Sequence, residues 1–271
     1  MEFTDTHAHL ALVAEELGPA ALDSVLAAYA AAWDEAAREG RAGPFLVDPG
    51  VDADDLGRRR ALLGAPPFLR LAAGVWPSAE ALAAPAAALA ALEAAMAEAE
   101  ASGRPAAAVG EGGLDYYHMN GPREAQLELF AGQIALAERL GLPLIVHSRD
   151  AFADTRDAIA GSRLSTPVIV HCFGYGPDEA RAFLDLGCYL SFAGNLTYKK
   201  ADALRAACSF APADRLLLET DSPYMCPEPR RGRPSTPLDI ERTYAIAAAA
   251  RGACVEELVE MVSANVAAIF R

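Results

Sequence analysis

One alternation runs through most of the chain: short apolar segments rich in β-branched residues are each followed by a longer segment of helical character. Eight of the short segments are predicted to be strands, at residues 2–7, 45–49, 69–76, 106–111, 142–147, 167–172, 188–192 and 216–221. Strands that alternate with helices predict right-handed βαβ units and a parallel sheet. Eight repeats of this unit predict an α/β fold that closes into a (β/α)₈ TIM barrel.

The segments between the strands complete this pattern. Helices are predicted at residues 20–40, 52–63, 78–102, 122–140, 150–161, 177–186 and 199–210, with one or two more within 237–270. The length of 271 residues is close to the roughly 250 that one barrel needs, and no linker divides the chain. We therefore expect a single TIM-barrel hydrolase domain over residues 1–271, with a long loop at 227–237 after the last strand.

Charge and composition restrict the partners and the compartment. The net charge is −14, which argues against non-specific binding to a polyanion. Two interpretations remain: the protein does not bind nucleic acid, or it does so through a local basic patch and metal ions. The sequence also lacks a basic leader with an apolar core, a membrane-length apolar run and any C-x-x-C pair. These absences predict a cytoplasmic protein that does not associate with membranes.

Six residues with metal-binding side chains fall at the predicted carboxyl ends of strands. They are His7, His9, Glu111, His147, His171 and Asp221. Each alone has an ordinary structural explanation, because a histidine can be hydrogen-bonded in a core and an acid can cap a turn. Active sites of this barrel form at the carboxyl ends of its strands, and buried charges there need partners. The conjunction therefore predicts a metal centre.

The ligand chemistry narrows the kind of centre. Imidazole and carboxylate ligands without thiolate suit Mg, Mn, Zn, Ni or Fe, and the sequence does not choose among them. Six ligands are too many for one tetrahedral ion, which favours two divalent metal ions bridged by one carboxylate. Such a pair activates a shared water for hydrolysis, and it stabilises both the attacking and the leaving oxygen.

The motifs that carry these residues resemble the TatD family of metal-dependent deoxyribonucleases. They are T-D-T-H-A-H-L at 4–10, G-E-G-G-L-D-Y-Y at 110–117, R-x-x-Q-x-x-x-F-x-x-Q at 123–133, L-P-L-I-V-H-S-R-D-A at 142–151, V-I-V-H-C-F at 168–173 and L-L-E-T-D-S-P-Y at 217–224. The resemblance runs essentially end to end and in order. It implies a hydrolase of the amidohydrolase-like barrel class that processes DNA 3′ ends with Mg²⁺ or other divalent ions.

The resemblance also implies roles for individual residues. One ion would be held by His7, His9, Glu111 and Asp221, and the other by Glu111, His147 and His171. Glu111 would bridge the two ions, and Asp221 would orient or deprotonate the attacking water. Arg149 would hold a phosphate oxygen, for which the planar guanidinium is better suited than a lysine.

Two departures from the family pattern concern the substrate rather than the metal. The usual G-x-H-P after the third strand is Gly74 to Pro77 here, with Trp76 in place of histidine; a tryptophan can stack on a base. The usual R-G-x-R-N-E-P after the last strand is R-R-G-R-P-S-T-P at 230–237, without the Asn-Glu pair. Both departures therefore bear on the natural substrate and not on the hydrolase class.

Most of the positive charge near the predicted site lies in two loops. Lys199 and Lys200 follow the seventh predicted strand, and Arg230, Arg231 and Arg233 follow the eighth. The loops after these two strands are neighbours in a barrel and commonly bind phosphate. The side chains are either solvated loop charges or a patch that faces DNA ends or a small phosphoester. No element suggests a subunit interface, so we expect a monomer.

Two other functions compete with a phosphoesterase. Amidohydrolases act on amides, lactones or other small esters with the same barrel, and many bridge their metals with a carboxylated lysine on the fourth strand. Here the only two lysines lie far from that strand, and Glu111 occupies the bridging place. A binding protein that kept the fold is the other alternative, and the complete set of six ligands argues against it.

Overall fold

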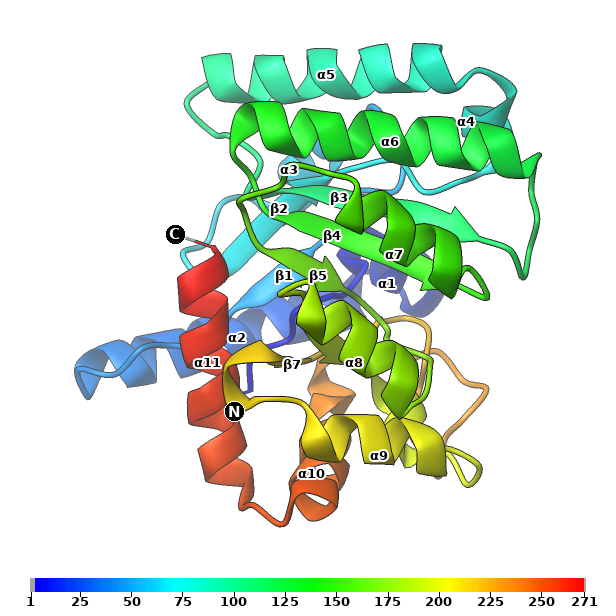
Figure 1. Ribbon diagram of the computed structural model, residues 1–271. Helices are drawn as coiled ribbons and strands as arrows, with labels where there is room; N and C mark the ends of the chain where they lie inside the picture. Colours follow the sequence, from blue (N-terminus) through cyan, green and yellow to red (C-terminus); the bar gives the residue numbers. More distant parts are fainter. Residues whose placement is uncertain (1–2, 271) are drawn as a thin grey trace.

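The computed structural model describes residues 3–270 and contains one parallel sheet whose seven strands neighbour each other in chain order (Figure 1). The strands are β1 (Leu46–Asp48), β2 (Leu69–Ala73), β3 (Ala108–Asp115), β4 (Leu144–Arg149), β5 (Val168–Val170), β6 (Tyr189–Phe192) and β7 (Leu216–Leu218). Seven of the eight predicted strands are confirmed, and the α/β barrel class with them.

The first predicted strand takes a different form. Of residues 2–7, Glu2 lies outside the described residues, and the rest of this segment carries only isolated bridges, from Asp5 to Leu46 and from Ala8 to Ser222. The backbone of this segment nevertheless forms hydrogen bonds with both edges of the sheet. Asp5 and Ala8 donate to the carbonyls of Phe45 and Val47, at 2.9 and 3.0 Å, beside β1.

On its other side the same segment meets the end of β7. Thr6 donates to the Leu218 carbonyl at 3.2 Å, and His9 donates to the Ser222 carbonyl at 2.8 Å. The His7 carbonyl accepts from the Asp221 amide at 2.9 Å. The segment therefore closes the curled sheet between its two edge strands. This closure places His7 and His9 beside the residues that follow β7.

Helices cover the outside of the sheet (Figure 1). Those that follow β1 to β6 are α3 (Leu56–Leu63), α4 (Ala79–Ala83), α5 (Pro85–Ala101), α6 (Arg123–Leu140), α7 (Phe152–Ala160), α8 (Pro177–Asp185) and α9 (Asp202–Phe210). The chain begins with α1 (Leu10–Leu17) and α2 (Pro19–Arg38), and it ends with α10 (Ile240–Arg251) and α11 (Val255–Ile269). Short 3₁₀ turns lie at Gly194–Thr197, Ala213–Arg215 and Pro237–Asp239. No helix among residues 3–270 is long and apolar enough to span a bilayer.

One helix prediction was wrong, and one helix was not predicted. The single helix predicted at 78–102 is divided into α4 and α5, because Ala84 precedes Pro85 and leaves the helical region, at φ −150° and ψ 67°. The ring of a proline disfavours helical backbone in the residue before it. Helix α1 was not predicted; it begins directly after His9 and ends at Gly18, whose φ is 87°.

The centre of β3 and β4 is packed too closely for side chains at some positions. Gly113 of β3 pairs with His147 of β4, and its φ is 152°. A Cβ atom on Gly113 would lie 1.9 Å from the His147 carbonyl oxygen. Glycine at this position therefore allows β3 to approach the strand that carries a predicted metal ligand.

Candidate metal centre

A cavity of about 430 Å³ lies at the carboxyl ends of the strands. Its wall includes five of the six predicted metal ligands, namely His9, Glu111, His147, His171 and Asp221. The sixth, His7, is fully buried beneath it. The ligands come from residues 3–9, which close the sheet and are called the closing segment, from β3 and β4, and from the residues just after β5 and β7. The fold therefore brings together all six residues at the predicted end of the barrel.

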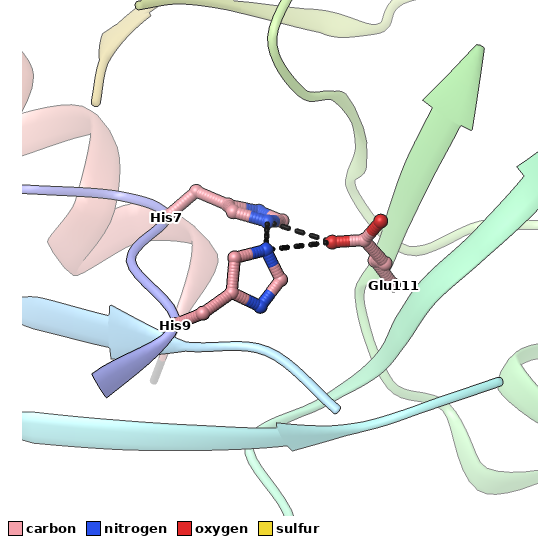
Figure 2. Close-up of side chains that lie close together, drawn as sticks. All are labelled: His7, His9 and Glu111. Carbon is pink, nitrogen blue, oxygen red and sulfur yellow. Dashed lines mark hydrogen bonds and ion pairs between the residues drawn. The ribbon is translucent and has the colours of Figure 1, made fainter. Parts of the chain in front are cut away.

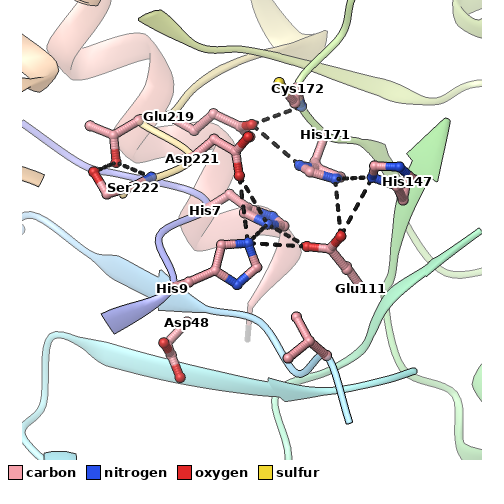
Figure 3. Close-up of polar contacts among 12 residues, drawn as sticks. His7, His9, Asp48, Glu111, His147, His171, Cys172, Glu219, Asp221 and Ser222 are labelled. Atoms are coloured by element: carbon pink, nitrogen blue, oxygen red, sulfur yellow. Dashed lines mark hydrogen bonds and ion pairs between the residues drawn. The ribbon is translucent and has the colours of Figure 1, made fainter. Parts of the chain in front are cut away.

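Glu111 lies at the middle of the cluster, and its two oxygens face different histidines (Figures 2 and 3). Oε2 lies 2.8 Å from His7 Nε2 and 3.3 Å from His9 Nε2. Oε1 lies 3.4 Å from His147 Nδ1 and 3.7 Å from His171 Nε2. A carboxylate divided in this way between two ligand pairs is arranged to bridge two cations.

The spacing of the nitrogen and oxygen atoms fits bound cations. A tetrahedral ion with bonds of about 2.0–2.1 Å holds its ligand atoms roughly 3.3–3.4 Å apart. His7 Nε2 and His9 Nε2 are 3.3 Å apart, and His147 Nδ1 and His171 Nε2 are 3.2 Å apart. Asp221 Oδ1 lies 3.5 Å from His9 Nε2. Three overlapping groups can hold an ion: His7 with His9 and Glu111, His7 with His171 and Asp221, and Glu111 with His147 and His171.

Carboxylates lie behind two of the histidines, on the ring nitrogens that face away from Glu111. His147 Nε2 lies 3.0 Å from Asp115 Oδ2. His171 Nδ1 lies 3.4 Å from Glu219 Oε1, which also accepts the Cys172 amide at 2.7 Å. A metal-binding histidine usually gives its other N–H to such an acceptor, which fixes the ring and makes it a better ligand. The residues present therefore fit a metal centre.

Charge balance within the cluster keeps its acids ionised. Burial would raise the pKa of Glu111, but His171 and His7 hold it well below its ordinary value. The pKa of Asp221 is lowered in the same way, against burial, by its contact with His9 and the charge of His171. Burial lowers the pKa of His171, but Glu111 and Glu219 outweigh it and raise this pKa to about 9. Both acids are thus anionic near neutral pH, as metal ligands must be.

Buried polar contacts fix the backbone under the cluster. Asp5 Oδ1 accepts the amides of His7 at 3.2 Å and Thr220 at 3.0 Å, and Oδ2 accepts the Thr220 hydroxyl at 2.6 Å. Asp48 Oδ1 accepts the Leu10 amide at 2.8 Å. These bonds join the closing segment to the residues after β7 and to β1. They therefore set where His7, His9 and the neighbouring acid lie.

A family model described as TatD related DNase matches residues 4–271. The chain belongs to the TatD family. This result confirms the resemblance carried by the sequence motifs.

Curated relatives of the TatD family match part of the chain. Over 164 residues it is 40% identical to the "Uncharacterized metal-dependent hydrolase YcfH" of Escherichia coli K12. This match covers 60% of this chain and 62% of the relative. Over 172 residues it is 35% identical to the "Uncharacterized metal-dependent hydrolase YabD" of Bacillus subtilis, covering 60% of this chain and 65% of that one. The chain thus spans just under two thirds of the length of these relatives.

Solved structures match over nearly the whole chain. The TatD homologue YjjV of Escherichia coli superposes with a TM-score of 0.82 at 27% identity, covering 99% of this chain and 98% of that one. The organophosphorus hydrolase of Deinococcus radiodurans superposes with a TM-score of 0.65 at 17% identity, covering 99% and 92%. The second similarity concerns the fold alone.

Two of the predicted substrate residues lie at the cavity of this TatD-family centre. Trp76 and Arg149 both line it. The Trp76 ring stands edge-on to the His147 ring, with centroids 6.0 Å apart. The Arg149 guanidinium lies over the Tyr117 ring, 4.2 Å from its centroid. An aromatic surface and a cation are thus available beside the ligands.

The remaining predicted substrate residues lie outside the lining of this cavity. Arg230 forms an ion pair with Asp239 in its own loop. The Arg231 guanidinium lies 4.2 Å from the centroid of the Tyr198 ring, so the loop after β7 touches the turn after β6. Arg233, Lys199 and Lys200 are exposed. The two loops are neighbours, as the barrel predicts, but none of these five charged side chains lines the cavity.

Sequence reasoning missed the carboxylates behind the histidines. Asp115 follows Glu111 by four residues, and Glu219 precedes Asp221 by two. Side chains two or four apart on an extended segment share a face. That periodicity, applied within the G-E-G-G-L-D and L-L-E-T-D motifs, was the signal that could have identified both.

Proposed function

We propose that this chain is a divalent-metal-dependent phosphoesterase that hydrolyses phosphate esters at DNA 3′ ends. The observation that carries the proposal is the division of the Glu111 carboxylate between two histidine pairs. Phosphoryl transfer is the chemistry for which paired cations a few ångströms apart are widely used. We also propose that the chain forms a single domain and acts as a monomer in the cytoplasm.

Two divalent ions, one held by His7, His9, Glu111 and Asp221 and the other by Glu111, His147 and His171, would polarise the phosphoryl group and acidify the attacking water. The protein side chains supply the other functions. Asp221 is ionised and lines the cavity, so it can orient the water and accept its proton. Arg149 can bind a phosphate oxygen through two parallel N–H bonds.

Recognition of a DNA end by an acidic protein requires local contacts. Trp76 offers a face for the terminal base, and a base stacked on an aromatic ring contributes about 1–3 kcal/mol. Lys199, Arg230, Arg231 and Arg233 would meet the phosphates that follow along the strand. With few phosphates contacted, we expect weak and salt-sensitive binding of short or single-stranded ends.

The test compares three substrates with and without added Mg²⁺ or Mn²⁺. They are a 3′-tailed DNA duplex, bis-p-nitrophenyl phosphate and a lactone. We expect metal-dependent hydrolysis of both phosphodiesters. Hydrolysis of the lactone alone would support the amidohydrolase alternative. Binding of metal without hydrolysis of any of the three would contradict an enzymatic role on these substrate classes.

A further inference from the structure

Asp115, at the carboxyl end of β3, is a buried carboxylate that orients two histidines. Its Oδ1 accepts the backbone amides of Tyr117 at 3.1 Å and His118 at 2.8 Å. Its Oδ2 lies 3.0 Å from His147 Nε2 and 2.8 Å from His118 Nδ1. The Asp115 side chain itself is 1% exposed. The metal centre accounts for the contact with His147 but not for the one with His118.

The carboxylate fixes the protonation of the His118 ring. An ionised carboxylate only accepts hydrogen bonds, so His118 Nδ1 must carry a hydrogen that it donates to Asp115. Nε2 is then the free end of the ring. It makes no hydrogen bond to any residue within the described range 3–270. The His118 side chain is 44% exposed, and it lines the cavity together with Glu111 and Asp221.

His118 and Asp221 belong to different sides of the cluster. Asp221 Oδ1 lies near His9, in the half of the site that Glu111 Oε2 faces. His118 is linked through Asp115 to His147, in the half that Glu111 Oε1 faces. The Trp76 ring stands edge-on to both His118 and His147, at 6.0 Å between centroids, and closes this half. A displacement at phosphorus needs an attacking oxygen on one side and a leaving oxygen on the other.

We infer that His118 is the general acid of the reaction and protonates the leaving oxygen of the ester. The bond between the water oxygen and phosphorus forms as the bond between phosphorus and the leaving oxygen breaks. Asp221 accepts a proton from the water. The imidazolium form of His118, which carries hydrogen on both ring nitrogens, gives its Nε2 proton to the leaving oxygen and becomes neutral. Solvent then carries the proton from Asp221 back to His118. Other histidine acid–base groups are arranged in the same way: a carboxylate holds the imidazole in position and stabilises its cationic form.

The inference rests on the proposed function and names a further catalytic residue for it. A competing explanation is structural: His118 would only satisfy Asp115 and hold the loop. The two explanations differ in the substrates that they affect. An alcohol leaving group needs a proton, whereas p-nitrophenolate leaves readily without one. Loss of a general acid therefore slows hydrolysis of the ester with an alcohol leaving group more than that of the p-nitrophenyl ester. A loosened loop would slow both alike.

The test is His118→Asn, measured on a thymidine dinucleotide and on bis-p-nitrophenyl phosphate in one preparation. The asparagine Nδ2 can keep the hydrogen bond of His118 Nδ1 to Asp115, but Nε2 is lost. We expect the ratio of kcat/KM on the dinucleotide to that on the aryl ester to fall by roughly 10²-fold, the usual contribution of a general acid. The ratio does not depend on the fraction of protein that is folded.

Three further measurements make the outcome decisive. His118→Gln serves as a second variant, and Met119→Ala, on the next residue outside the cavity lining, is the control whose ratio should equal that of the wild type. Metal content, measured by mass spectrometry, should be the same in all three. A ratio within twofold of the wild type in both His118 variants overturns the inference. Failure of the wild type to cleave either phosphodiester would instead refute the proposed function.

Discussion

At the scale of single residues, the proposed pair of cations depends on the placement of Glu111. The residue is 3% exposed, and each oxygen faces a different pair of histidines. A glutamine at this position would keep the shape but would present one neutral oxygen and one amide NH₂. An amide cannot bridge two cations, because its nitrogen has no lone pair to offer.

For Glu111→Gln we expect a loss of phosphodiesterase activity of at least about 10³-fold and a loss of metal-induced stabilisation. A ligand present at a hundred times its dissociation constant stabilises a protein by about 2.7 kcal/mol. In a protein of this size that raises the melting temperature by roughly 5–10 °C. Differential scanning fluorimetry with and without Mn²⁺ measures the shift. The exposed Glu124→Gln is the matched control, and an equal Mn²⁺ shift in both variants would contradict the bridging role.

The role proposed for Asp221 as the base has a different test, because that role is chemical rather than structural. Its backbone has φ of 57°, a conformation that asparagine adopts more readily than most residues. Asp221→Asn should therefore fold normally, with an unchanged circular dichroism spectrum. Its kcat on bis-p-nitrophenyl phosphate should fall by roughly 10²-fold or more, since an amide cannot accept the proton of water. Wild-type turnover in this variant would exclude Asp221 as the base.

At the scale of elements, the contact between β3 and β4 sets the distance between Glu111 and His147. Gly113 lies between these ligands in the sheet, pairs with His147, and has no room for a Cβ atom. Because the blocking atom is a backbone carbonyl oxygen, the strands themselves must separate to accept a side chain.

Gly113→Ala should destabilise the fold by more than about 2 kcal/mol, through the clash and the strained backbone. The measurement is the free energy of unfolding in urea. Gly57→Ala is the matched control: Gly57 is exposed in α3, and a Cβ atom there would meet nothing within 4 Å. Because alanine is a better helix former, this control should gain up to about 1 kcal/mol. Equal stability of the two variants would mean that β3 and β4 separate freely.

At the scale of the whole molecule, the net charge of −14 opposes any approach of DNA. The loop after β7 is locally positive, because it contains Arg230, Arg231 and Arg233. Arg231 packs on Tyr198, which holds that part of the loop against the turn after β6, and Arg230 is paired with Asp239. Two of the three arginines of this loop therefore have contacts that fix their place.

The triple substitution Arg230, Arg231 and Arg233 to alanine should lower kcat/KM on a 3′-tailed oligonucleotide by about tenfold at low salt. The effect on bis-p-nitrophenyl phosphate should be less than twofold, because that ester does not reach the loop. The difference should shrink as salt rises, since counterion release weakens. A triple substitution of the exposed Arg104, Arg139 and Arg163 removes the same charge from the loops that precede β3 and β5 and from the last turn of α6. Equal losses in both triple variants would mean that net charge alone controls binding.

The sequence by itself determined the fold class and identified the six residues that meet at the candidate metal centre. Strand periodicity and chain order suffice for this, because parallel strands of a barrel all end at one rim. Seven strands and the position of His7, His9, Glu111, His147, His171 and Asp221 at that rim followed from local pattern alone.

Only the tertiary structure decided which atoms face each other. The division of Glu111 between two histidine pairs depends on side-chain torsions, and the partners of its oxygens come from distant parts of the chain. The isolated bridges of the closing segment depend on both edge strands at once. The link from His118 through Asp115 to His147 joins a loop to a neighbouring strand, and no sequence period encodes it. Local patterns fix which rim a residue reaches, whereas contacts across strands fix what it touches there.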